Sequence, residues 1–469
     1  MPAIEWPTVL DPDLVRRVLS EALSSGGRFA ELFAEVRAST SIRLDDGRIE
    51  EVVNGQDRGA GVRVFHGEAQ AYAFSNRLDP ESLIRAARVA ADAVTRGGPA
   101  PVIADLRRGE PLRHEIDEAF DAVPVERKVA WLREADESAR SFDPAIRQLM
   151  GSYADGRQQV LVANSEGLWV EEDRPRVRLF VQVVAARDGV MQTGHEGPGG
   201  TTGAELLRRF PPAQTGERAA RQAVAMLDGK PSPAGEMTVV VGPGGGGILF
   251  HEACGHGLEA DHIQKDASVF KGKLGARLAS PLVTGVDDGR IPEAWGSFAV
   301  DDEGTPAHRT VLFQEGELLG YLYDRLRADH DGVPSTGNGR RQSYASLPIP
   351  RMSNSSILPG QDRAEDVIAG TKRGLYARTL GGGQVNPATG DFVFGVSEGY
   401  LIEDGRITSA VRGANLIGNG PQILAAIDAV AEDYETRDGV CGKEGQGAPV
   451  SNGSPTIRIA RMTVGGRGA

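Results

Sequence analysis

Apolar residues in the first half of the chain recur at the spacings of amphipathic helices and of strands in hairpins. A stripe through Leu83, Ala86 and Ala90 returns to one face every three or four residues, which predicts a helix over residues 79–96. The same reasoning predicts helices over residues 11–25, 124–141 and 201–227. Strand patterns predict a hairpin over 33–44 that turns at 45–47, pairing of 61–65 with 70–74, and long strands that include 161–163 and 176–184. This half is therefore predicted to be a mixed α+β domain.

The second half carries mainly strand signals. Apolar and β-branched runs stand at residues 238–241, 310–313, 392–394 and 400–402, with turns at Glu315-Gly316, Asp404-Gly405 and Asn419-Gly420. Short strands with regular turns are typical of a barrel or sandwich. The Pro- and Gly-rich stretch 228–235 is a candidate linker between the halves. We therefore predict an α+β fold with an N-terminal α+β domain at 1–230 and a β-rich C-terminal domain at 235–469.

Composition narrows the class of protein. The chain has 469 residues, which favours two domains, and a net charge of −13, which opposes binding to nucleic acid. It contains no apolar run of about 18 residues, and its start has no basic end followed by an apolar core, so we expect neither a membrane span nor a secretory signal. Only two cysteines occur, which fits a reducing cytoplasm better than a secreted disulfide scaffold.

The run His251-Glu252-Ala253-Cys254-Gly255-His256 places two imidazoles and a carboxylate within six residues. Neutral imidazole is a favoured zinc ligand, and a catalytic zinc keeps one position open for water. A carboxylate beside that water can take its proton and pass it to a leaving amine. The H-E-x-x-x-H spacing is one residue longer than the common H-E-x-x-H of zinc proteases.

That extra residue sets a geometric condition. Residues five apart on an ideal helix differ by about 140° around the axis, so His251 and His256 cannot share a face of a straight helix. Either a π-type bulge inserts one residue, or the helix ends between them. Gly255 and Gly257 flank His256 and make either distortion easy.

The motif needs a third ligand, and the sequence offers several. Glu259, Asp261 and His262 lie nearby, and Cys254 lies three residues after His251. Cys441 stands in a glycine-flanked loop close to Lys443, which could favour its thiolate. Without such a partner, the two histidines could be ordinary hydrogen-bonded residues. A lone cysteine could equally be a small buried apolar residue.

Two other features invite functional interpretations. Gly242, Gly244 and Gly247 fit the G-x-G-x-x-G pattern of dinucleotide-binding folds, but residues 262–275 contain no clear buried strand ending in an acid, which that fold requires. We favour the interpretation that these glycines let a backbone, such as that of a substrate, approach closely. Arg340-Arg341 could bind a substrate carboxylate, although ion pairs with Asp301 or Asp302 are the favoured interpretation.

Beyond the motif, several segments carry a family resemblance. The chain resembles a TldD-type subunit of the TldD/PmbA (TldE) family of zinc metallopeptidases. The similarity is strong over nearly the whole second half and general in layout over the first. The segments that carry it are His251-Glu252-Ala253-Cys254-Gly255-His256, Asp301-Asp302-Glu303-Gly304, Thr336-Gly337-Asn338-Gly339-Arg340-Arg341, Gly381-Gly382-Gly383-Gln384-Val385 and Val440-Cys441-Gly442-Lys443-Glu444-Gly445-Gln446.

The resemblance implies Zn²⁺ held by His251, His256 and Cys441, with Glu252 as the base that activates water. It also implies a dimer, formed with a TldE/PmbA-type subunit that lacks the motif or with a second copy. The implied substrates are unfolded or flexible peptides, including precursors and leaders of peptide natural products. Cys254 departs from the small non-ligand residue expected within the motif.

We therefore predict a cytoplasmic zinc-dependent peptidase with no nucleic-acid or membrane partner. The alternative from the same family is a non-catalytic peptide-binding or regulatory subunit, against which the intact motif argues. A DNA-topology modulator is a third possibility, but the acidic balance offers no electrostatic footprint for DNA.

Overall fold

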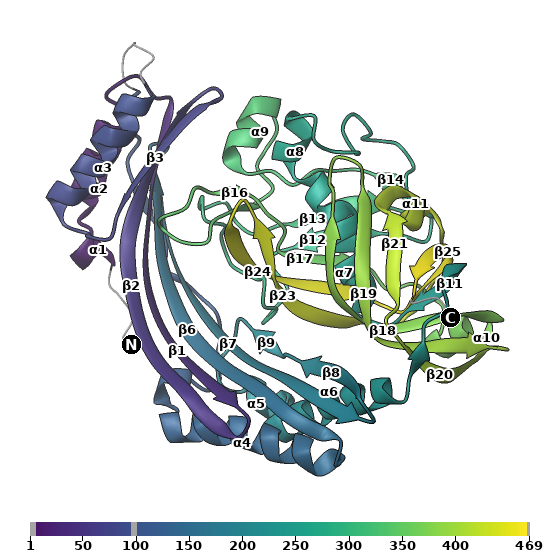
Figure 1. Ribbon diagram of the computed structural model, residues 1–469. Coiled ribbons are helices and arrows are strands. Elements are labelled where there is room, and N and C mark those ends of the chain that lie inside the picture. Colours follow the sequence, from purple (N-terminus) through teal and green to yellow (C-terminus); the bar gives the residue numbers. More distant parts are fainter. Residues whose placement is uncertain (1–5, 95–100, 467–469) are drawn as a thin grey trace.

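The computed structural model describes residues 6–94 and 101–466, which form an arched N-terminal sheet set against a β-rich C-terminal unit (Figure 1). The long strands of the arch are antiparallel, in the order β3-β2-β1-β6-β7. They and the short strands beside β7 are β1 (Phe29–Asp45), β2 (Arg48–His66), β3 (Ala69–Ser75), β4 (Arg107–Arg108), β5 (Leu112–Arg113), β6 (Ile146–Asn164), β7 (Leu168–Arg187), β8 (Val190–Glu196) and β9 (Gly199–Gly200). Both predicted hairpins are confirmed: β1 turns into β2 at Asp46-Gly47, and Gly61 pairs with Phe74.

Helices cover the outer face of the arch in two groups, seen at its two ends in Figure 1. They are α1 (Trp6–Val9), α2 (Pro12–Ala22) and α3 (Pro80–Ala93) at one end, and α4 (Val125–Phe142), α5 (Leu206–Arg209), α6 (Pro212–Leu227) and a 3₁₀ turn (Phe120–Ala122) at the other. Asp11 and Asp79 cap α2 and α3 by accepting backbone N–H groups. Each group buries a separate apolar cluster against the sheet.

The predicted helix over 201–227 is correct only in its second part. The continuous helix begins at Pro212, because proline lacks a backbone N–H and fits the first turn of a helix. Residues 95 and 96 of the predicted helix over 79–96 lie outside the described residues. No helix among the described residues is both long and apolar enough to cross a membrane.

The C-terminal unit contains a closed ring of five strands, so the predicted barrel is confirmed. Neighbours in the ring are β19, β18, β11, β25 and β21, and β21 pairs back onto β19. The ring and its attached strands are β10 (Lys230–Pro231), β11 (Gly235–Val241), β18 (Arg373–Val385), β19 (Asp391–Glu403), β20 (Arg406–Arg412), β21 (Asn415–Asn419), β22 (Ile427–Val430) and β25 (Ile457–Gly465). The strand signals at 392–394 and 400–402 belong to one strand, β19, rather than to two.

A second sheet packs beside the ring in the order β14-β13-β12-β17-β24-β23 and shares its apolar core. Its strands are β12 (Gly285–Asp288), β13 (Arg309–Gln314), β14 (Glu317–Leu318), β17 (Asn354–Ile357), β23 (Glu435–Lys443) and β24 (Gln446–Ser454), with β15 (Gly339–Arg340) and β16 (Ile349–Pro350) as a separate pair. The helices here are α7 (Gly245–Phe250), α8 (Ala260–Gln264), α9 (Arg325–Asp331), α10 (Ala364–Ala369) and α11 (Gly420–Ala425). The turns at Glu315-Gly316 and Asp404-Gly405 are present with positive φ, whereas Asn419-Gly420 joins β21 to α11.

The chain passes from the arch to the C-terminal unit through residues 228–235. Within this segment Lys230–Pro231 forms β10, which pairs in parallel with β20. The domain boundary between residues 230 and 235 stays a prediction.

Candidate metal centre

A glycine-rich turn follows β11 and leads into α7. An added Cβ at Gly247 would lie 2.4 Å from the backbone nitrogen of Gly453 in β24, so glycine is required for this close approach. Gly245, Gly246 and Gly247 are all buried against the protein itself. The backbone that approaches these glycines therefore belongs to this chain, and they do not form an open cradle for a dinucleotide.

The helix changes its winding at the motif. His251–Gly255 forms a π-helical turn, and His256–Leu258 continues as 3₁₀. The π-type insertion that the five-residue spacing requires is therefore confirmed. Close packing accompanies it, since a Cβ at Gly255 would lie 2.0 Å from Met352 Sδ. The π turn brings the His251 and His256 rings to 5.0 Å between centroids, at 87° to each other.

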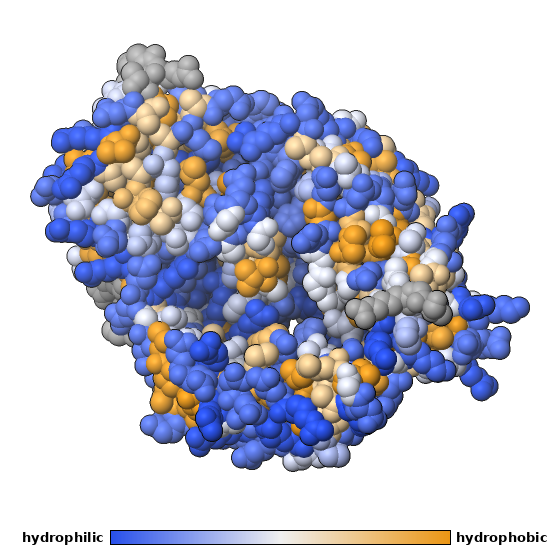
Figure 2. Space-filling view, in the orientation of Figure 1, coloured by the Kyte–Doolittle hydropathy of each residue, from blue (hydrophilic) through white to orange (hydrophobic). Residues whose placement is uncertain are grey.

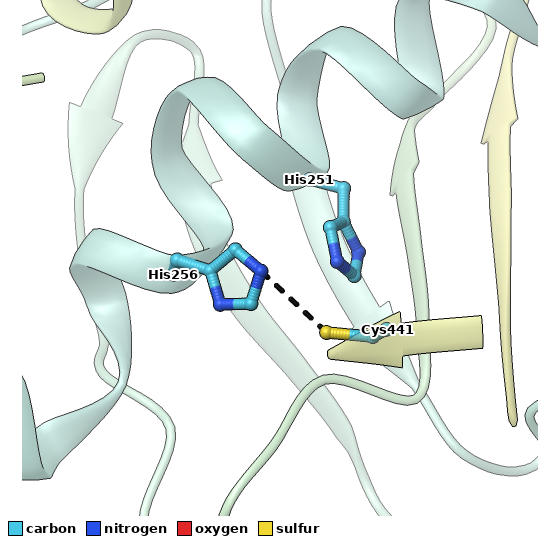
Figure 3. A group of neighbouring side chains, drawn as sticks. All are labelled: His251, His256 and Cys441. Atoms are coloured by element: carbon cyan, nitrogen blue, oxygen red, sulfur yellow. Dashed lines mark hydrogen bonds between the residues drawn. The ribbon is translucent and has the colours of Figure 1, made fainter. Parts of the chain in front are cut away.

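Cys441 reaches the two imidazoles from β23, far away in sequence (Figure 3). Its Sγ lies 3.5 Å from His256 Nε2. One ligand atom from each of His251, His256 and Cys441 lies within 4.8 Å of the others, and all three residues are buried. Cys254, the other cysteine, is fully buried and stands outside this group.

The polar atoms of the group suit a metal that prefers nitrogen and sulfur donors. Burial raises the pKa of the Cys441 thiol, but the neighbouring His251 and His256 imidazoles outweigh it and lower that pKa to about 4. The Cys441 side chain is therefore a thiolate at neutral pH. Burial instead raises the pKa of Cys254, which favours its neutral thiol. His251 Nδ1 is buried with no hydrogen-bond partner among the described residues, so one ring nitrogen of His251 remains unsatisfied. Two imidazoles and one thiolate fit Zn²⁺ and leave a fourth position open.

A second layer of charged side chains lies behind His256. The ring Nδ1 lies 3.1 Å from Glu259 Oε2, and Lys443 Nζ lies 3.0 Å from Glu259 and 2.7 Å from Asp261. Burial raises the pKa of Glu259, but the Lys443 ammonium and the His256 ring lower it to about 2. Glu259, Asp261 and His262, which the sequence offers as alternative ligands, form a separate group around this lysine.

Glu252 lies beside the three donor residues. Its Oε2 is 3.8 Å from His256 Nε2, and 25% of its side chain is exposed, against 11% for the His256 side chain. The carboxylate can therefore exchange protons with a water molecule next to the donors.

Comparison with known proteins gives the family. Three family models match in chain order: PmbA/TldA metallopeptidase domain 1 over residues 30–94, the central domain over 118–227, and the C-terminal domain over 234–466. The chain is 39% identical to the metalloprotease TldD homolog of Haemophilus influenzae, with 93% of each chain covered. It is 26% identical to the zinc metalloprotease TldD homolog of Saccharolobus solfataricus, over 96% of this chain and 99% of that relative.

Two solved structures share the fold. A putative modulator of DNA gyrase from Thermotoga maritima superposes with a TM-score of 0.80 at 22% identity, over 97% of this chain and 99% of that one. TldE from Thermococcus kodakarensis gives 0.76 at 20% identity, over 97% and 100%. Together with the family models, which cover most of the chain, these findings confirm the resemblance carried by the sequence motifs. The chain belongs to the PmbA/TldA metallopeptidase family and is similar throughout to its TldD-type metalloproteases.

Proposed function

We propose that this chain is a zinc-dependent peptidase in which His251, His256 and Cys441 hold Zn²⁺ and Glu252 is the general base. The convergence of two imidazoles with a thiolate carries this proposal, since the three donors come from two distant segments and lie within 4.8 Å of one another. The zinc relative from Saccharolobus solfataricus supports the choice of metal. When bound, Zn²⁺ supplies a lowered water pKa and a polarised carbonyl.

The chain's own residues provide proton transfer and orientation. Glu252 takes a proton from the attacking water and returns it to the leaving nitrogen, because it is the partly exposed carboxylate beside the donors. Glu259 accepts the Nδ1 proton of His256 and so keeps Nε2 directed at the donor group. The burial of all three donors keeps bulk water from competing for them.

The substrates we propose are unfolded or flexible peptides, including precursors or leaders of peptide natural products. The partner we propose is a TldE/PmbA-type subunit or a second copy of this chain, and the fold shared with TldE supports that choice. A cytoplasmic location agrees with the two cysteines, which are both free thiols.

The experiment measures zinc by elemental analysis and cleavage of an unstructured peptide, with the purified chain and with Glu252→Gln. We expect both proteins to hold about one zinc, and only the wild type to cleave. Glu217→Gln on the exposed face of α6 is the matched control and keeps activity. A wild type that holds no zinc and binds the peptide without cleaving it would instead identify the non-catalytic alternative, and cleavage by Glu252→Gln at the wild-type rate would remove Glu252 from its role.

A further inference from the structure

The face of β7 that is turned toward the C-terminal unit carries a row of three arginines. Arg174 donates to Asp302 and to the Val300 carbonyl, and Arg178 Nη2 lies 3.5 Å from the Asp438 carbonyl. Successive side chains of a strand alternate between faces, so Arg176 points the same way, while Val177 packs under the helices. Gly156 is the register partner of Arg176 on β6.

The arginines at this interface divide into two kinds. Arg63, Arg174 and Arg341 each have carboxylate partners, namely Glu31 and Glu303 for Arg63, Glu172 and Asp302 for Arg174, and Glu31 for Arg341. Within residues 6–94 and 101–466, no carboxylate oxygen lies within 4.0 Å of the guanidinium of Arg176, Arg178 or Arg340. These three guanidinium groups therefore lack a direct ion pair, although Glu172, Asp438 and Asp302 lie near enough to attract Arg176, Arg178 and Arg340 respectively.

Arg176 is the least satisfied of them. Among the described residues, its one hydrogen bond is a 3.3 Å contact from Nη1 to the neutral Gln158 amide, and its Nε is buried without a partner. Arg340 is 5% exposed and contributes a further positive charge near Arg176. Its Nη1 donates a hydrogen bond to the Met352 carbonyl. Burial and repulsion from Arg174 and Arg340 lower the pKa of Arg176 to about 9. A desolvated cation without an anion is costly, and an incoming carboxylate offsets that cost.

We propose that Arg176 and Arg178 bind a carboxylate of the peptide substrate, either its C-terminal carboxylate or an Asp or Glu side chain. The proposal rests on the peptidase function proposed above. Guanidinium presents planar paired donors that match a carboxylate, and both arginines retain partial exposure on the side facing the C-terminal unit. Figure 2 shows the molecular surface hollowed between that unit and the arch.

The distance to the metal centre sets where on the peptide that carboxylate lies. The Asp438 carbonyl, which Arg178 contacts, belongs to the same strand as Cys441 and precedes it by three residues. Three residues of a strand span about 10 Å. If an extended peptide places its scissile bond at the metal centre, the peptide residue about three positions from that bond therefore lies beside the arginines. The exposed Val440 side chain lies along this path.

The test uses zinc-loaded protein and two matched pairs of flexible peptides that share one cleavage site. One pair differs only in a free or amidated C-terminus three residues from that site, and the other has Glu or Gln at that distance inside a longer amidated peptide. We expect kcat/KM to favour the acidic member of one pair by about tenfold. The pair that shows the preference identifies the source of the carboxylate. Equal kcat/KM within both pairs overturns the proposal.

Variants then assign the preference to this site. Arg176→Gln should bring the ratio of acidic to neutral kcat/KM close to one without changing zinc content. Its thermal midpoint should not fall, since the change removes a partly buried charge that has no direct ion pair. Arg85→Gln, which removes the same charge from an exposed position on α3, should keep the ratio. An Arg176→Gln protein that keeps the preference, or that unfolds because the guanidinium is structural, contradicts the proposal.

A binding measurement separates this proposal from the peptidase function. Zinc-loaded Glu252→Gln is titrated with the same peptides, and the acidic member should bind about tenfold more tightly. If the wild type cleaves none of the peptides, the peptidase function fails, while the binding ratio still reports on the arginines. Equal dissociation constants would overturn the carboxylate site alone.

Discussion

His256 Nδ1 lies 3.1 Å from the Glu259 carboxylate, and Nε2 of the same ring faces Cys441 Sγ at 3.5 Å. Glu259 is fully buried and is held in turn by Lys443, which stands two residues after Cys441 on β23. One strand therefore brings both the sulfur donor and the cation that fixes the carboxylate behind the ring. This coupling makes the orientation of His256 depend on the same segment that completes the centre.

Glu259→Gln should weaken zinc binding about 10- to 100-fold, because partners behind a ligand histidine fix its tautomer and orientation. The amide can turn either its oxygen or its nitrogen toward the ring, and it leaves Lys443 with Asp261 as its one carboxylate partner in the part of the chain that the structure describes. Zinc affinity is measured by competition with a chromophoric chelator. The control Glu217→Gln should match the wild type. A variant affinity within twofold of wild type would show that Glu259 does not position the ring.

The two cysteines should respond differently to removal of sulfur. Cys441→Ala should lose most of its zinc, because only two imidazoles remain. Cys254→Ala should keep its zinc and lose about 1 kcal/mol of unfolding free energy, since its sulfur fills space in the core. Elemental analysis and urea denaturation of both variants make the comparison. Retention of zinc by Cys441→Ala together with loss in Cys254→Ala would move the third donor to Cys254.

The sequence pattern predicted correctly those elements that depend mainly on residues close together in the chain. The distorted helix at the motif follows from a five-residue spacing and adjacent glycines, and it is present as a π turn. The hairpin turns at Asp46-Gly47 and Glu315-Gly316 each contain a glycine with positive φ, which glycine adopts at no steric cost. The merging of two strand signals into β19 was not predicted, because its length depends on pairing with β18 and β21.

Long-range contacts could not be read from the sequence. Geometry alone left five candidates for the third donor, and the family resemblance selected Cys441, whose contact with His256 spans 185 positions. Arg341 was expected to pair with Asp301 or Asp302. Its side chain instead forms its ion pair with Glu31, 310 positions away, and reaches only the carbonyl oxygen of Asp302. Arg340 has no carboxylate partner at all among the described residues, and no local signal distinguishes it from its neighbour.

Gly247→Ala should both destabilise the fold and reduce zinc content. Its added methyl would lie 2.4 Å from the backbone nitrogen and 2.6 Å from the carbonyl oxygen of Gly453, and a backbone in a paired strand cannot move aside easily. We expect a loss of about 1–3 kcal/mol, measured by urea denaturation, because α7 must shift and carry His251 with it. Gly382→Ala is the matched control, since an added Cβ there meets nothing within 4 Å. Equal stability of the two variants would contradict the close approach of β24 to α7.

Glu205 should make the stability of the arch depend on pH. It accepts hydrogen bonds from the Thr202 hydroxyl and from the backbone N–H groups of Gly203 and Glu118. Burial raises the pKa of Glu205, but these hydrogen bonds outweigh it and lower the pKa to about 2. A carboxyl whose folded pKa lies below its unfolded value of about 4.3 stabilises the fold above that value and loses the effect as pH falls toward 2. Glu205→Gln should therefore unfold at lower urea than wild type at pH 7, and the gap should narrow between pH 4.5 and pH 3. A gap that stays constant over this range would mean that the ionised form of Glu205 is not the form that these donors stabilise.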